Sequence, residues 1–219
     1  AGPEVGVAAT KTFATQMALF YLLALRLAQA RKTLPEDEIA RLLAEVDALP
    51  ARMAEFLEGD HLKVIEEVAQ HHYDKPFFLY LGRHIGLPVC LEGALKLKEI
   101  SYIPTEAYSA GEMKHGPIAL LDEETPVVCI ATDSHVYDKV VSNIQETRAR
   151  GAKVIAIATD GNEDIQHHAD DVIYVPRTHP LLQAVLAVLP LQLLAYKIAR
   201  LRGLNIDQPR NLAKTVTVE

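Results

Sequence analysis

Apolar residues recur at helical spacing through the first third of the chain. Over residues 10–30 the helical period meets few breakers, which predicts one long helix, and a polar joint follows at residues 31–35. Residues 36–57 and 60–72 predict two further helices. We expect the first of these two to be interrupted at Pro50, because proline lacks the backbone N–H that a helix interior needs.

Strand and helix patterns alternate in the rest of the chain. Residues 76–81 are short and aromatic-rich, as in a buried strand, and run through Gly82 and Gly86 into an apolar helix. Further buried strands are expected at residues 126–132, 153–159 and 171–176, an amphipathic helix at 137–150, and a closing helix at 180–202 that Pro190 kinks or splits. This alternation predicts an α/β fold with a parallel sheet flanked by helices, followed by an irregular tail at residues 204–219.

Three charged residues form a stripe on the helix that covers residues 91–102. Glu92, Lys96 and Glu99 are four and three positions apart, so they lie on one side of the helix. The rest of that helix is apolar almost all round, which is typical of a buried helix whose charges face a cleft, a partner or each other. A solvated Glu/Lys ladder has the same spacing, and the helix taken alone favours that alternative.

Two other residues carry candidate chemistry. His115 stands in the turn at residues 111–117, where a side chain that titrates near neutrality could move a proton; a turn histidine without such a role is the alternative. Lys214 is the lysine of the tail, and a lysine amine attacks a carbonyl to form an imine when its pKa is lowered. The alternative for Lys214 is an ordinary solvated terminus.

Histidines and glycines give weaker signals. The histidine pairs at residues 71–72 and 167–168 lack acidic or cysteine partners at ligand spacing, so no metal site is predicted. Gly82 and Gly86 bracket a turn that could cradle a phosphate, although a plain tight turn also explains them. Residues 132–135 are a possible anion loop in which Asp133 would oppose a phosphate.

Composition narrows the class of protein. The net charge of -7 over 219 residues argues against a nucleic-acid surface. The longest apolar runs, at residues 17–25 and 184–191, are shorter than the roughly 20 residues of a membrane span, so none is expected. Cys90 and Cys129 lie in apolar segments, and the N-terminus lacks a signal-peptide pattern, which indicates reduced thiols and a cytoplasmic protein. Ala1 in place of Met suggests a fragment.

Four motifs together resemble one family. Residues 1–11, 91–102, 107–117 and 207–219 are similar to the isomerase part of the glutamine-fructose-6-phosphate aminotransferases, also called glucosamine-6-phosphate synthases. The resemblance implies flavodoxin-like, three-layer sugar isomerase (SIS) domains. It assigns residues 1–34 to the closing helix of a preceding SIS domain, 35–203 to the second SIS domain and 204–219 to a catalytic tail. A weak echo between residues 15–20 and 191–196 agrees with a repeated unit.

The resemblance also implies roles for individual residues. Lys214 matches the lysine that forms an imine with C2 of the open-chain ketose, and Glu99 matches the base that moves a proton between C1 and C2. His115 matches a histidine that assists ring opening and is donated by the other subunit of a homodimer. The remaining matches are Lys96 and Glu92, hydrogen-bonded around the base, and Ala213, whose backbone lies beside the sugar. This chemistry needs neither a metal nor a cofactor.

The implied reaction converts fructose 6-phosphate and glutamine to glucosamine 6-phosphate and glutamate. The glutaminase domain and the first SIS domain, with its phosphate-binding loops, have no match here, so the fragment alone is expected to be weakly active or inactive. Two departures are Ala9, where many relatives have Ser, and His84, where many have Gly. Alternative hypotheses are a non-catalytic sugar-phosphate-binding module and another SIS-type isomerase or deglycase. Lys214 disfavours the first alternative, and the ending at residues 207–219 disfavours the second.

Overall fold

A parallel sheet forms the centre of the molecule. The computed structural model describes residues 1–214, and residues 215–219 of the predicted tail lie outside the described residues. In chain order the elements are α1 (Lys11–Arg31), α2 (Glu36–Glu58), α3 (His61–His72), β1 (Phe78–Gly82), α4 (Gly86–Ser101), β2 (Thr105–Ser109), the 3₁₀ helices η1 (Met113–His115) and η2 (Pro117–Leu120), β3 (Pro126–Ala131), α5 (Tyr137–Arg148), β4 (Lys153–Thr159), η3 (Asp164–His167), β5 (Asp171–Val175) and α6 (Gln183–Leu201).

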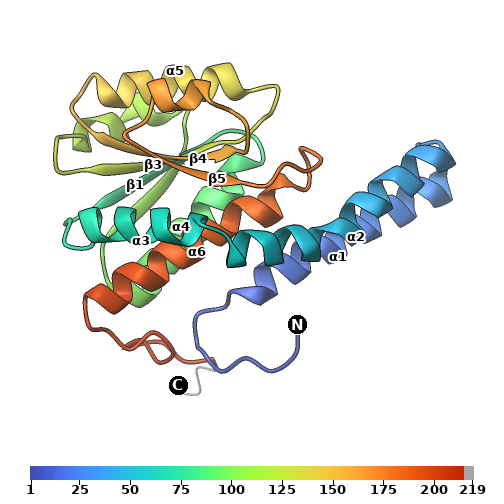
Figure 1. Cartoon of the computed structure of the whole chain (residues 1–219), viewed down its shortest axis with the longest axis horizontal. Helices are drawn as coiled ribbons and strands as arrows, with labels where there is room; N and C mark the ends of the chain where they lie inside the picture. Colours follow the sequence, from blue (N-terminus) through green and yellow to red (C-terminus); the bar gives the residue numbers. More distant parts are fainter. Residues whose placement is uncertain (215–219) are drawn as a thin grey trace.

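The strands pair in the order β2-β1-β3-β4-β5, and every pairing is parallel. Helices α3, α4 and α6 cover one face of the sheet and α5 covers the other (Figure 1). Side chains alternate between the faces: Phe78 and Tyr80 join the core beneath α4 and α6, whereas Leu79 and Leu81 join the core beneath α5. The predicted α/β fold with a helix-flanked parallel sheet is confirmed.

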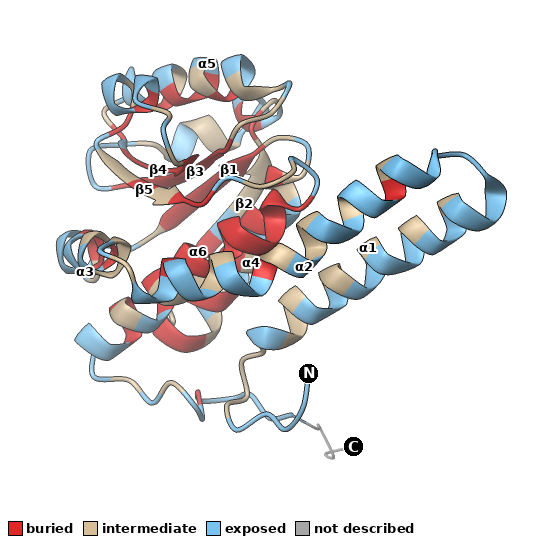
Figure 2. Cartoon of the chain, turned by 45° about the vertical axis from the view of Figure 1, so that its right-hand side comes forward, coloured by how far each residue is buried: buried red, intermediate tan, exposed pale blue. Residues whose placement is uncertain are grey.

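Helices α1 and α2 form a hairpin that projects away from this α/β body (Figure 2). α2 is anchored by Leu49 and Phe56, which are buried, whereas α1 has no buried residue. Apolar side chains of α1 are instead open to solvent, with Leu19 at 63% and Phe20 at 64% exposed. Large apolar side chains that are exposed together on one helix are typical of a surface that another segment covers.

Two helices, α1 and α6, have the length and apolar composition of a membrane-crossing helix. α6 is a core helix, with 67% of its most apolar stretch buried against the rest of the molecule. α1 lies near the N-terminus and none of it is buried. A core helix meets the same criterion of length and composition, so this is weak evidence for a span. The expectation that no segment crosses a membrane stays a prediction.

Three details differ from the sequence-based expectations. β2 was not predicted, since this edge strand is half-polar and only Thr105 on it is buried. The expected interruption at Pro50 is wrong, because α2 continues through it with buried anchors on both sides. Of the kink or split expected at Pro190, the split is wrong: α6 is one helix, and the packing of its buried residues offsets the missing backbone hydrogen bond.

The two cysteines are free and buried. Burial raises the pKa of Cys129 to about 12 and also raises the pKa of Cys90, because the apolar core disfavours a thiolate. Both thiols are therefore protonated at neutral pH.

Gly93 sets how closely α4 and α6 pack. A Cβ at this position would lie 2.5 Å from Cδ1 of Leu191 and 3.1 Å from a ring carbon of Tyr80. We therefore expect Gly93→Ala to lower the free energy of unfolding by about 1–3 kcal/mol, despite the better helix propensity of alanine. Urea denaturation measures the loss. Ser142→Ala on the exposed face of α5 is the control and should change stability by less than about 0.5 kcal/mol.

Candidate active site

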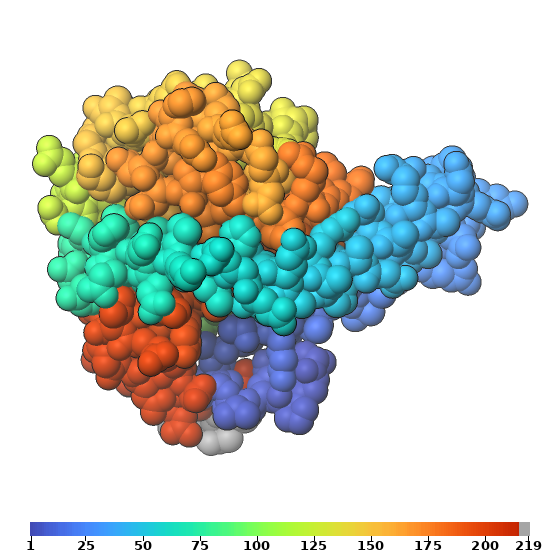
Figure 3. Space-filling view, in the orientation of Figure 1, coloured from blue at the N-terminus to red at the C-terminus, as the bar shows by residue number. Residues whose placement is uncertain are grey.

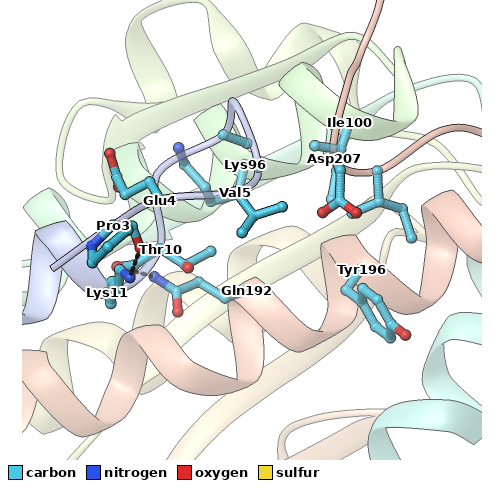
Figure 4. Close-up of a pocket in the computed structure, with 13 residues that line it drawn as sticks. Pro3, Glu4, Val5, Thr10, Lys11, Lys96, Ile100, Gln192, Tyr196 and Asp207 are labelled. Atoms are coloured by element: carbon cyan, nitrogen blue, oxygen red, sulfur yellow. Dashed lines mark hydrogen bonds between the residues drawn. The ribbon is translucent and has the colours of Figure 1, made fainter. Parts of the chain in front are cut away.

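A pocket of about 400 Å³ lies where the two ends of the chain meet α4 and α6. Figure 4 shows that Pro3, Glu4 and Val5 enter it from the N-terminal loop, whereas Gln192 and Tyr196 rise from α6. Other lining residues are Lys96 and Ile100 of α4, Gly6, Thr10, Lys11, and Asp207 of the tail. The wall thus combines segments from the beginning, the middle and the end of the chain.

The N-terminal loop and the tail are bound to each other. The N–H of Val7 donates to the carbonyl of Asp207 at 2.8 Å, and the side-chain amide of Gln192 donates to the carbonyl of Thr10 at 3.2 Å. A Cβ at Gly6 would come within 3.3 Å of an Asp207 carboxylate oxygen, so the two segments are in close contact there. In the space-filling view the N-terminal loop and the described part of the tail gather at the lower edge of the molecule (Figure 3).

The tail also crosses the end of α4. The Tyr102 hydroxyl accepts a hydrogen bond from the N–H of Arg210 at 2.7 Å, and the Arg210 guanidinium stands 4.3 Å from the centre of the Tyr102 ring. Tyr102 ends α4 with a φ of 60°. These contacts hold the tail beside the helix that carries the charged stripe.

The charged stripe on α4 is a largely buried cluster. Lys96 is 4% exposed, and its Nζ lies 2.6 Å from Oε2 of Glu99 and 3.7 Å from Oε1 of Glu92. A solvated ladder would leave these side chains in water, so that alternative is wrong. Burial raises the pKa of Glu92, and the neighbouring Glu99 carboxylate acts in the same direction, whereas Lys96 opposes the shift.

The raised pKa of Glu92 predicts a pH dependence of stability. A carboxyl whose pKa is higher in the folded state binds a proton more tightly there, so the native state loses stability as the pH rises from about 4.5 through the folded pKa. Glu92→Gln removes this titration. We expect the stability of the variant relative to the parent to increase over that pH range in urea denaturation. A difference that stays constant with pH would contradict this expectation.

Lys214 is paired with an acidic residue of the N-terminal loop. Its Nζ lies 2.8 Å from Oε2 of Glu4, and Thr12 donates to the other Glu4 oxygen at 2.6 Å. These two hydrogen bonds lower the pKa of Glu4, the one from Lys214 most. Glu4, the partner of Lys214, lines the pocket together with Lys96 of the α4 cluster. Ala213, the preceding residue, is exposed.

His115 does not line this pocket within one chain. β2 ends at Ser109, beside the carboxyl end of β1 at Gly82, and His115 follows at that edge of the sheet. α4 starts at the same edge and runs back along the sheet, so Lys96 lies ten residues, or about 15 Å, along the helix from its start. Met113 is buried while His115 is exposed, so the turn is anchored with its histidine facing outward.

The structure resolves the weaker sequence signals. A Cβ at Gly82 would lie 2.4 Å from the backbone of Gly86, which supports the plain tight turn. Asp133 of the possible anion loop forms an ion pair with Arg177, and its N–H donates to Thr159. Among residues 1–214, no three histidine, cysteine or acidic side chains cluster as metal ligands.

Sequence reasoning did not single out Glu4, Gln192 or Asp207 as members of the site. The motif at residues 1–11 assigns no role to Glu4, and Gln192 belongs only to the internal echo. Their contacts join distant parts of the chain, so no local pattern identifies them.

The sheet order and the pocket at the chain ends define a class of protein, a three-layer α/β domain with a site completed by flanking segments. The family model of the SIS domain matches residues 75–202, so the chain belongs to the SIS domain family. This confirms the SIS domain that the resemblance of the four motifs implies.

Curated relatives include glutamine–fructose-6-phosphate aminotransferases from Thermus thermophilus and Methanosarcina mazei. They are 57% and 50% identical over all 219 residues, which correspond to 36% and 35% of the relatives' own length. The chain therefore spans about a third of the curated relatives it matches.

Among solved structures, the C-terminal domain of the Francisella tularensis glucosamine-fructose-6-phosphate aminotransferase matches with a TM-score of 0.87 and 36% identity. That match covers 94% of this chain and 58% of the other. A glucosamine-6-phosphate deaminase from Thermotoga maritima matches with a TM-score of 0.71 and 27% identity, covering 98% of this chain and 59% of the other.

Proposed function

We propose that this chain is the isomerase part of an enzyme that converts fructose 6-phosphate and glutamine to glucosamine 6-phosphate and glutamate. The observation that carries the proposal is the ion pair of Lys214 with Glu4, which lines the same pocket as Lys96 of the buried Lys96–Glu99 pair. The whole-length similarity to aminotransferases of this activity supports it. The sugar phosphate is the ligand of the pocket.

In the proposed reaction the amine of Lys214 forms an imine with C2 of the open-chain ketose. Ammonia then adds to C2 and displaces the Lys214 amine, which gives fructosimine, and the C2 imine makes the hydrogens on C1 acidic. Glu99 removes a proton from C1 and delivers it to C2. Lys96 hydrogen-bonds Glu99 at 2.6 Å and holds its carboxylate in one orientation, while Glu92 completes the cluster. The backbone of Ala213 lies beside the sugar. No metal or cofactor takes part.

We further propose that His115 acts in the pocket of a second copy in a homodimer, where it assists ring opening. Support comes from the outward-facing turn of His115 and from its position at the sheet edge where α4 begins, whereas Lys96 lies about 15 Å further along that helix. A site that needs two copies makes turnover depend on association.

The chain is proposed to be one part of a longer, cytoplasmic protein. Residues 1–34 then close a preceding SIS domain, residues 35–203 form the second SIS domain, and residues 204–219 are the catalytic tail. The exposed apolar side chains of α1 support this division, since the preceding domain would cover them. A glutaminase domain would supply ammonia.

Imine trapping tests the proposed function. Incubating the full-length protein with fructose 6-phosphate and borohydride should attach one reduced sugar, at Lys214. Lys214→Arg, which keeps the charge beside Glu4 but lacks the nucleophilic amine, is the matched control and should take up none. A modification elsewhere, or none at saturating sugar, would overturn the proposal.

The isolated chain is expected to form little or no glucosamine 6-phosphate, because the phosphate-binding loops of the preceding domain are missing. Robust product formation by these 219 residues would contradict this expectation. A sugar-phosphate-binding module without catalysis would have no use for an imine-forming lysine. Trapping at Lys214 therefore also distinguishes the proposed enzyme from such a module.

A further inference from the structure

We propose that Glu4 is the proton acceptor that frees the amine of Lys214 for attack on the sugar carbonyl. This inference rests on the proposed function, because it assigns a task only if Lys214 forms an imine. It adds to the site a residue from the first few positions of the chain.

The geometry suits a direct proton transfer. The 2.8 Å separation of Lys214 Nζ and Glu4 Oε2 is that of a charge-assisted hydrogen bond. The other oxygen of Glu4 accepts the Thr12 hydroxyl at 2.6 Å, which fixes the orientation of the carboxylate. Thr12 belongs to the first turn of α1, and the loop between is held by the bond from Val7 to Asp207. Glu4 is therefore positioned from both sides.

The positive charges around Glu4 lower its pKa and keep the carboxylate ionised, so its oxygens carry no proton before the transfer. Lys214 faces it from the tail, Lys11 stands near it on α1, and Lys96 lines the same pocket from α4. Asp207 is the other acidic residue that lines the pocket, and its carboxylate is in close contact with the loop at Gly6. Glu99 and Glu92 are engaged with Lys96 on α4, which leaves Glu4 as the carboxylate in contact with Lys214 among the described residues.

The proton balance of the step is closed. An N–H bond of the Lys214 ammonium breaks and an O–H bond forms on Glu4, which leaves the amine with a free electron pair. That pair attacks C2, and the carbonyl oxygen, with the proton released from nitrogen, becomes the hydroxyl of a carbinolamine. Glu4 then returns its proton to this hydroxyl, which departs as water and leaves a protonated imine beside the restored carboxylate.

The test measures borohydride trapping of fructose 6-phosphate at Lys214 in the full-length protein between pH 6 and pH 10. For Glu4→Gln we expect a trapping rate roughly 10²–10³-fold lower at pH 7, the usual range for a lost proton-transfer group. The deficit should shrink as the pH rises, because hydroxide then deprotonates Lys214 without help. Glu4→Asp, which keeps the carboxylate but shortens its reach, should show a smaller deficit of the same form.

The matched control is Glu66→Gln. Glu66 pairs with Lys197 at 3.2 Å, away from the pocket lining, so its replacement removes the same charge from a Lys–Glu pair and should leave trapping unchanged. Circular dichroism confirms that the variants fold. If Glu4→Gln does not fold, Glu4→Asp and Thr12→Val provide the pH series instead, since each disturbs the same carboxylate.

Three outcomes separate the inference from the proposed function. A deficit that is the same at every pH would assign Glu4 a purely structural role and overturn the inference. Unchanged or faster trapping by Glu4→Gln at pH 7 would also overturn it, while trapping at Lys214 in the parent keeps the proposed function. Absence of trapping in an active parent protein would overturn both.

Discussion

Replacing Lys96 by Met is expected to lower the free energy of unfolding by about 3–5 kcal/mol at pH 7. Lys96 is 4% exposed and is the cation placed between Glu92 and Glu99. Methionine has a similar length and no charge, so the substitution leaves two partly buried carboxylates facing each other without a counter-ion. The penalty comes from these stranded charges rather than from lost packing.

Urea denaturation at several pH values checks this expectation. At acidic pH the two carboxyls take up protons in the folded variant, so the loss of stability should shrink towards pH 4. Lys98→Met, an exposed position of the same helix, is the control and should change stability by less than about 0.5 kcal/mol. If both substitutions destabilise equally, the α4 cluster is not the source of the effect.

Glu99→Gln in the full-length protein is expected to lower the rate of glucosamine 6-phosphate formation by roughly 10²–10⁴-fold, as for the loss of a general base. Glutamine keeps the size of the side chain and an oxygen that can accept from Lys96, but it cannot take a proton from C1. Borohydride trapping at Lys214 should remain, since imine formation precedes the proton transfer.

Comparing product formation with borohydride trapping identifies the step that Glu99→Gln loses. Exchange of the C1 hydrogen of bound sugar with deuterated solvent should disappear together with product formation. Glu67→Gln, on the exposed side of α3, is the control and should retain both. If Glu99→Gln also abolished trapping, the role of Glu99 would lie in sugar binding instead of proton transfer.

Local patterns predicted the parts of the structure that depend on neighbouring residues. The alternation of strands and helices and the i, i+4 and i+3 spacing of the charged stripe both survive in the folded molecule. The interruption expected at Pro50 and the split expected at Pro190 do not occur, because packing outweighs the intrinsic penalty of proline in both helices. β2 was not predicted because it is an edge strand with a single buried residue, so its sequence lacks the apolar run that marks the buried strands.

The pairing of Glu4 with Lys214 could not be predicted from the sequence. The two residues lie near opposite ends of the described chain. They meet only because the α/β body folds between them and brings both segments to the same place. For His115 the sequence motif identifies the residue as a candidate. The motif does not reveal at which edge of the sheet the histidine lies.

The contact between the N-terminal loop and the tail has a consequence for how the pocket arises during synthesis. Residues 3–11 leave the ribosome before the rest of this chain, yet their partner Asp207 and the residue that pairs with Glu4 are made only after the sheet and α6 are complete. Contacts of such sequence separation close slowly and late, because the entropy of the intervening chain must first be lost. A nascent chain that stalls before the tail can therefore hold a folded sheet and still have no binding pocket.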